Sequence, residues 1–124
     1  MEKSNKPIIE HIPGFLDYCE VEKGLSSNTQ RNYRHYLKKF ASWLKENNKE
    51  ALLPHNLNSD DIWSYRLYLS RSQDKRGKTL KRITQHYYLI ALRALLSYFT
   101  AKDIVLRPLE ELFCLRAVKL CLWL

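Results

Sequence analysis

The chain has 124 residues, of which 45% are hydrophobic and 27% charged, and it carries a net charge of +8 at pH 7. This composition indicates one globular domain and excludes intrinsic disorder, and the low counts of Gly (3) and Pro (4) argue against a many-stranded β architecture. No run of about 18 apolar residues is present, so no membrane-spanning helix is expected.

Cysteine and histidine positions give no sign of a metal site. Cys19, Cys114 and Cys121 show neither a Cys-x-x-Cys pair nor zinc-ligand spacing, and the four histidines lack i, i+4 pairing. No signal peptide, glycine-rich phosphate loop or Gly-x-Ser-x-Gly motif is found. We therefore predict reduced cysteines, a cytoplasmic location, and no metal, cofactor, membrane partner or small-molecule substrate.

The first half of the chain predicts two amphipathic helices. Apolar residues recur at helical spacing from residue 8 to about 23, although Pro13-Gly14 leaves a start at Pro13 as an open alternative. Gly24 ends this helix. A capping-box pattern that begins at Ser27 and reaches Gln30 predicts a second helix to about residue 48, with one apolar and one basic face.

The second half predicts two further helices. Asn58 or Ser59, followed by two Asp residues, fits the start of a third helix. Residues 70–78 contain Gly77 and predict a loop, after which Thr79 is the expected cap of a fourth helix over residues 80 to about 102. The middle of that helix is apolar nearly all round, so we expect it at the centre of a bundle. Its expected core stripe is Leu80, Ile83, Tyr87, Ile90, Ala91, Ala94 and Tyr98.

These segments predict an all-α fold, a bundle of four helices over residues 8–104. Residues 105–124 form a strongly apolar tail for which two interpretations stay open. The tail either adds a C-terminal helix that packs on the bundle, or it is the abnormal end of a truncated or frameshifted gene and exposes a sticky surface.

The positive charge is concentrated in two segments. Residues 27–49 contain six basic and one acidic residue, and residues 71–86 contain the same numbers, so each segment carries +5. Because the whole chain carries +8, the remainder carries −2. Both segments include a helix start, where backbone N–H groups and the helix dipole favour phosphate, which predicts nucleic-acid binding.

The eight tyrosines are interpreted mainly as core residues. Tyr36, Tyr65, Tyr87 and Tyr98 fall on apolar stripes, and burial is also expected for Tyr33. Tyr33 and Tyr88 lie close enough to the basic faces for a hydroxyl to reach a phosphate, although burial is the favoured interpretation for Tyr33. We predict no catalytic residue.

Two blocks resemble phage-integrase-like tyrosine recombinases of the Xer type. The first is Gly24-Leu25-Ser26-Ser27-Asn28-Thr29 with Tyr33, Leu37, Phe40 and Trp43-Leu44. The second is Leu57, Asp60-Asp61-Ile62, Lys78-Thr79, Ile83 and the run from Leu89 to Phe99. The resemblance implies an N-terminal core-binding (SAM-like) domain that grips one face of duplex DNA, with the catalytic Arg, Lys, His and Tyr residues in a separate domain. No His-x-x-Arg sequence occurs here.

The resemblance and the charge together define a candidate DNA-binding set, and other recombinase protomers are a further expected partner. The set consists of Ser27, Asn28, Thr29, Arg31, Arg34, Lys38, Arg76, Lys78, Thr79, Lys81, Arg82 and Gln85. In the alternative interpretation the chain is a helical protein-interaction module whose basic surface only confers solubility. Steep salt dependence of DNA affinity would favour the first interpretation.

Overall fold

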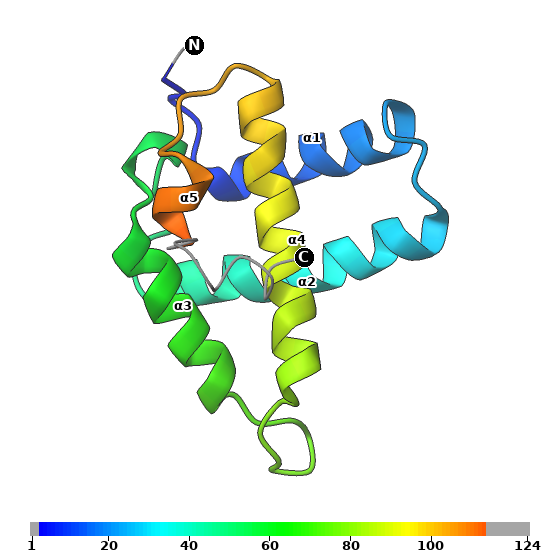
Figure 1. Ribbon diagram of the computed structural model, residues 1–124, viewed down its shortest axis with the longest axis vertical. Helices are drawn as coiled ribbons and strands as arrows, with labels where there is room; N and C mark the ends of the chain where they lie inside the picture. Colours follow the sequence, from blue (N-terminus) through cyan, green and yellow to red (C-terminus); the bar gives the residue numbers. More distant parts are fainter. Residues whose placement is uncertain (1–2, 114–124) are drawn as a thin grey trace.

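The computed structural model describes residues 3–113 and confirms the all-α prediction (Figure 1). Its helices are α1 (Ile8–Val21), α2 (Ser27–Glu46), α3 (Ser59–Arg71), α4 (Arg82–Ala101) and the single turn α5 (Leu109–Leu112), with a 3₁₀ turn at Pro54–Asn56. An isolated antiparallel bridge joins Gln73 and Thr79 in the loop between α3 and α4. No described helix is long and apolar enough to cross a membrane.

Helix α4 is the centre of the bundle, as expected from its apolar sequence. It runs the length of the molecule, with α1 and α2 crossing it and α3 and α5 on one side (Figure 1). Leu92, Leu95 and Phe99 on α4 are fully buried against the apolar faces of the other helices. Leu112 and Phe113, at the end of α5, are buried in the same core. The rest of the apolar tail, residues 114–124, lies outside the described residues.

The buried face of α4 differs from the predicted stripe. Ile83 is 53% exposed and Tyr87 is 46% exposed, whereas Tyr88 is buried. The predictions of Ile83 and Tyr87 as core residues were therefore wrong. A helix that is apolar nearly all round offers several equivalent stripes, so sequence spacing alone does not select the face that packs.

Helix α1 begins at Ile8, where the backbone N–H donates to the Leu52 carbonyl over 2.9 Å. Pro13 lies inside the helix, so the alternative start at Pro13 was wrong. The neighbouring Gly14 allows a close approach, because a Cβ placed there would lie 3.1 Å from the Tyr98 hydroxyl of α4. This position therefore lets α1 and α4 meet at short range.

Helix α3 starts with a complete capping box. The Asn58 side chain accepts from the Asp61 N–H, and the Asp61 carboxylate accepts from the Asn58 N–H. Asp61 is also buried and forms an ion pair with Lys49, which comes from the connection after α2. One carboxylate thus fixes both the helix start and the preceding loop.

Helices α2 and α4 share a sequence pattern and the hydrogen bond that goes with it. Each has 20 residues, and the Leu25, Thr29, Gln30, Tyr33 and Leu37 positions of the first recur 55 residues later as Leu80, Thr84, Gln85, Tyr88 and Leu92. In both helices the glutamine Nε2 donates to the carbonyl of the preceding leucine over 2.9 Å. Each helix is followed by a residue in the left-handed region, Asn48 (φ 57°) or Asp103 (φ 58°).

The caps of these two helices differ from the predictions. Ser26, not Ser27, caps α2, and its Oγ accepts from the Thr29 N–H over 3.2 Å. Thr79 does not cap α4: it pairs with Gln73, and the helix begins two residues later than predicted, after Lys81. The bridge keeps Thr79 in the loop, two residues before the cap position at Lys81, which spacing along the chain does not reveal.

We expect Asp61→Ala to lower the free energy of unfolding by about 2 kcal/mol, because it removes the carboxylate that accepts from the Asn58 N–H in the capping box and leaves Lys49 without its ion-pair partner. Urea denaturation measures this. The control is Asp60→Ala, which changes an exposed neighbour and should cost less than about 1 kcal/mol. Equal losses in the two variants would contradict the proposed role of Asp61.

Candidate nucleic-acid interface

The first candidate segment follows the outer face of α2. Ser27, Asn28, Arg31, Arg34 and Lys38 are all exposed, because the opposite face carries the apolar residues of the core. The Oγ of the cap residue Ser26 accepts a hydrogen bond at the helix start, and the basic side chains project from the turns that follow. This segment therefore offers three cations to solvent along about three turns of helix.

Thr29 differs from the other candidates on α2. It is half-buried, and its hydroxyl forms a 3.0 Å hydrogen bond with the hydroxyl of Ser26. Thr29 is therefore part of the helix start itself, and its side chain contributes less to the open surface than its neighbours do.

The second candidate segment is the turn between α3 and α4. Asp74 orders it, since its Oδ1 accepts from the N–H groups of Arg76 (2.8 Å) and Lys78 (3.0 Å). Gly77 has φ +80°, a conformation that side chains disfavour, so glycine is required at this point of the turn. The side chains of Arg76, Lys78, Thr79, Lys81 and Arg82 are exposed.

Gln85 has a structural role at the start of α4. It is half-buried, and its Nε2 donates to the Leu80 carbonyl. Lys81 occupies the cap position, and its ammonium group has no acceptor for the N–H groups of the helix start. The first-turn N–H groups of α4 therefore have no side-chain cap, and the positive end of the helix dipole lies beside Lys81 and Arg82.

The two candidate segments occupy different parts of the surface. The start of α2 lies at one side of the molecule, and the start of α4 lies at the end where the loop from α3 projects (Figure 1). The helices meet between these points, where the rings of Tyr36 and Tyr87 stack at 6.4 Å and those of Tyr36 and Tyr88 meet edge to face at 4.8 Å. The two segments are therefore connected through the contact between α2 and α4, but they do not form one continuous surface patch.

Three exposed or half-buried residues at this contact were not among the candidates. His35 lies 3.4 Å from the Tyr88 hydroxyl, and the Lys39 ammonium lies over the Tyr88 and Tyr68 rings at 5.7 and 5.2 Å. Tyr87 is the third. Because Tyr87 was predicted to be a core residue, the sequence did not indicate that this contact is exposed. The spacing of His35 and Lys39, one turn apart on the outer side of α2, is the signal that could have indicated it.

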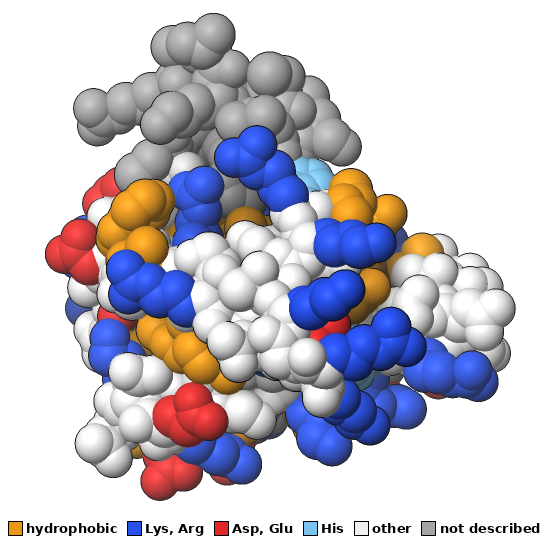
Figure 2. All heavy atoms as spheres, turned by 90° about the horizontal axis from the view of Figure 1, so that it is seen from below, with side chains coloured by type: hydrophobic (Ala, Val, Ile, Leu, Met, Phe, Trp, Pro, Cys, Tyr) orange, Lys and Arg blue, Asp and Glu red, His pale blue; other side chains and the backbone are white. Residues whose placement is uncertain are grey.

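Charge is unevenly distributed over the end of the molecule at which α4 begins. Figure 2 shows this end, where Lys and Arg side chains are densest along one edge but also occur across the rest of the face, and most of the acidic side chains lie toward the opposite edge. Lys49 does not add to the available charge, because it is paired with Asp61. Among residues 3–113, no group of three or more His, Cys, Asp and Glu residues is placed to hold a metal ion.

Residues 12–103, most of the chain, match the family model described as "Phage integrase, N-terminal SAM-like domain". The chain is also similar to the protein named "Tyrosine recombinase XerD" in two strains of Mycobacterium tuberculosis, CDC 1551 / Oshkosh and ATCC 25618 / H37Rv. Each is 27% identical over 115 residues, which is 92% of this chain and 35% of the relative. The chain thus spans about a third of the length of these relatives. No solved structure gives a significant match.

The repeated glutamines lead to a stability prediction. We expect Gln30→Ala and Gln85→Ala each to cost about 1 kcal/mol, because each removes one partly buried hydrogen bond to a leucine carbonyl. The two bonds belong to different helices, so the double variant should lose about 2 kcal/mol. Urea denaturation checks both values. Gln73→Ala, at an exposed loop position, is the control and should change stability little, while unequal losses at the two helices would refute the common design.

Proposed function

The chain belongs to the phage integrase N-terminal SAM-like domain family, and from this membership we propose that it binds duplex DNA as the core-binding half of a site-specific tyrosine recombinase. Such a role places it in DNA integration and recombination. The observation that carries the proposal is the pair of basic helix starts, built alike on α2 and α4 and held in fixed relation where the two helices pack.

Phosphates are the proposed ligands of these starts. Arg31, Arg34 and Lys38 on α2 and Arg76, Lys78, Lys81 and Arg82 near α4 are exposed. Side chains of this kind neutralise phosphates and position a protein on a duplex without reading its sequence. Ser27, Asn28 and Thr79 add short exposed donors, and the first-turn N–H groups of α4 favour an anion by their dipole. Thr29 and Gln85 contribute indirectly, because their side chains form hydrogen bonds that stabilise the two helix starts.

The proposal assigns no strand cleavage to these residues. A tyrosine nucleophile has to lose its proton, and burial raises the pKa of Tyr33, Tyr68 and Tyr88 above the usual value. Burial raises the pKa of Tyr65 further still. Each of these hydroxyls is therefore harder to ionise than a tyrosine in water. The matched region also corresponds to the N-terminal domain of the family.

We expect Arg34→Ala or Arg82→Ala to weaken binding to unrelated duplexes to a similar degree and to make the salt dependence shallower. Loss of one phosphate contact should reduce the slope of log affinity against log salt by roughly 0.9. Fluorescence anisotropy with two duplexes of different sequence, between about 50 and 200 mM salt, measures this.

Lys6→Ala provides a charge-matched control. Lys6 is exposed and lies just before α1. The amino-terminal end of the chain is at the opposite end of the molecule from the start of α4 (Figure 1). This variant should keep the parent slope. The proposal is refuted if the Arg variants bind as the parent does, or if the parent shows no salt-sensitive binding to duplex DNA. The second result would favour the protein-interaction alternative.

We also expect the chain to bind DNA without nicking it or forming a covalent bond to it. The measurement uses a labelled duplex containing a suspended break that traps a tyrosyl-phosphate linkage, followed by denaturing electrophoresis. A protein-linked band that disappears on changing a single tyrosine to Phe would overturn this expectation. An unlinked but retarded duplex in a native gel is the expected result.

A further inference from the structure

An aromatic cluster lies where α2 packs against α4, between the two basic helix starts, and it consists of His35, Tyr36, Tyr87 and Tyr88. The Tyr36 ring stacks on Tyr87 at 6.4 Å and meets Tyr88 edge to face at 4.8 Å. The His35 imidazole lies 5.5 Å from the Tyr36 ring and 6.0 Å from the Tyr88 ring. Tyr88 is buried, but Tyr87 is 46% exposed and His35 is exposed as well. The surface between the two candidate segments is therefore aromatic and open to a ligand.

His35 is held in place although it is exposed. Its Nε2 lies 3.4 Å from the Tyr88 hydroxyl, which can donate to a neutral imidazole and can accept from a protonated one. Burial raises the pKa of Tyr88, so this phenol keeps its proton near neutral pH. Because Nε2 faces Tyr88, Nδ1 is the ring nitrogen that remains for a ligand. A phosphate at this point would meet the imidazole and not the buried phenol.

Titratable and charged groups approach this cluster from three helices. They are Arg31, Arg34, Lys38 and Lys39 of α2, Tyr87 and Tyr88 of α4, and Tyr68 of α3, whose ring lies 5.2 Å from the Lys39 ammonium. The carboxylates of these helices lie elsewhere. Helix α4 contains none, those of α3 are in its first turn, and the one on α2, Glu46, follows His35 by about three turns. The charges around His35 are therefore suited to an anion.

We infer that His35 is a further contact to a DNA phosphate, placed between the two basic helix starts, and that it takes up a proton when the duplex binds. The inference rests on the proposed DNA binding and adds to it one residue and a dependence on pH. A phosphate beside an imidazole favours the protonated form, because that form gains an ion pair and a charge-assisted hydrogen bond. Lys39 and Tyr87 flank the imidazole with an ammonium group and a phenol hydroxyl, which can donate to the same stretch of DNA backbone.

The coupling between proton uptake and binding has a defined sign. Because the duplex favours the protonated imidazole, the side chain should titrate at a higher pH in the complex than in the free protein. The additional affinity is then complete below the titration of the free protein and is lost as the pH rises through the titration of the complex. If the two midpoints differ by about one pH unit, affinity should be about fivefold higher near pH 6 than near pH 8.

Fluorescence anisotropy of the full chain tests this, with either duplex of the salt titration at constant ionic strength. The parent should bind about fivefold more tightly near pH 6 than near pH 8. His35→Gln keeps an amide that can bond to the Tyr88 hydroxyl but cannot take up a proton. This variant should bind as the parent does near pH 8, and its affinity should change by less than about twofold between the two pH values. A merely structural role of His35 would instead weaken binding equally at both.

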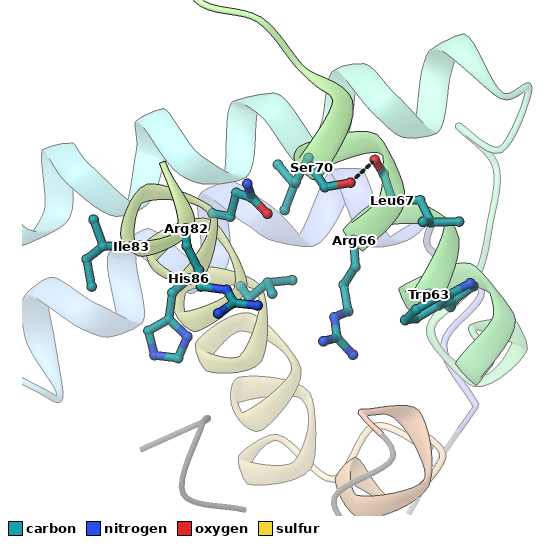
Figure 3. A pocket seen from close by; sticks show the side chains of 10 residues that line it. Trp63, Arg66, Leu67, Ser70, Arg82, Ile83 and His86 are labelled. Carbon is teal, nitrogen blue, oxygen red and sulfur yellow. Dashed lines mark hydrogen bonds between the residues drawn. The ribbon is translucent and has the colours of Figure 1, made fainter. Parts of the chain in front are cut away.

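His86→Gln is the matched control. Figure 3 shows His86 beside Arg82, in the groove between α3 and α4. It precedes Tyr88 by two residues and therefore projects from a different side of α4, away from the cluster. The control variant should keep the pH dependence of the parent. An equal loss of pH dependence in the two glutamine variants would contradict the assignment to His35.

A second measurement needs no change in the protein. NMR titration of the imidazole C–H resonances, with and without the duplex, should give a midpoint for His35 that is about one pH unit higher in the complex, whereas that of His86 should move less. An unchanged His35 midpoint, equal pH dependence of the parent and His35→Gln, or equal weakening at both pH values would overturn this inference and leave the proposed DNA binding intact. Absence of salt-sensitive duplex binding would refute the proposed function and this inference with it.

Discussion

The packing of α2 against α4 is the contact on which the rest of the structure depends. Leu37, Phe40 and Leu44 of α2 and Leu92 and Leu95 of α4 are almost completely buried, which favours folding by roughly 2 kcal/mol for each large side chain. The same contact fixes the directions in which the two basic helix starts project. A cavity in this layer would therefore lower stability and also change the relative placement of the candidate DNA-binding segments.

Features with a local cause were predictable from the sequence, and features with a tertiary cause were not. The Asn58 start of α3 depends on residues within one turn, and the four main helices follow from apolar spacing. By contrast, the burial of Tyr88 and the exposure of Tyr87 depend on which side of an almost wholly apolar α4 meets α2. Thr79 failed as a cap because its backbone pairs with Gln73 across the turn, a contact that only the folded loop creates.

The candidate site shows the same division. Composition and charge indicated both basic segments, and the exposure of Arg31, Arg34 and Arg82 agrees with their predicted accessibility. Charge counting did not reveal that Lys49 is paired with Asp61, or that the Gln85 amide donates a hydrogen bond to the Leu80 carbonyl. The repeat that relates Gln30 to Gln85 was present in the sequence, but its meaning depends on two hydrogen bonds that spacing alone does not specify.

The separation of the two helix starts restricts the ligands that can contact both at once. From Ser27 to Tyr36 along α2 is about 14 Å, and from Arg82 to Tyr87 along α4 is about 8 Å, with the stacked rings of Tyr36 and Tyr87 between these arms. The two arms point in different directions, so the two helix starts lie apart on the surface (Figure 1). A mononucleotide or a free phosphate reaches one start only. Phosphates of one DNA strand repeat about every 3.4 Å along the axis, so a duplex of several base pairs is needed to bridge both. Full affinity should therefore require a duplex of at least that length, whereas a surface that only confers solubility has no such length requirement.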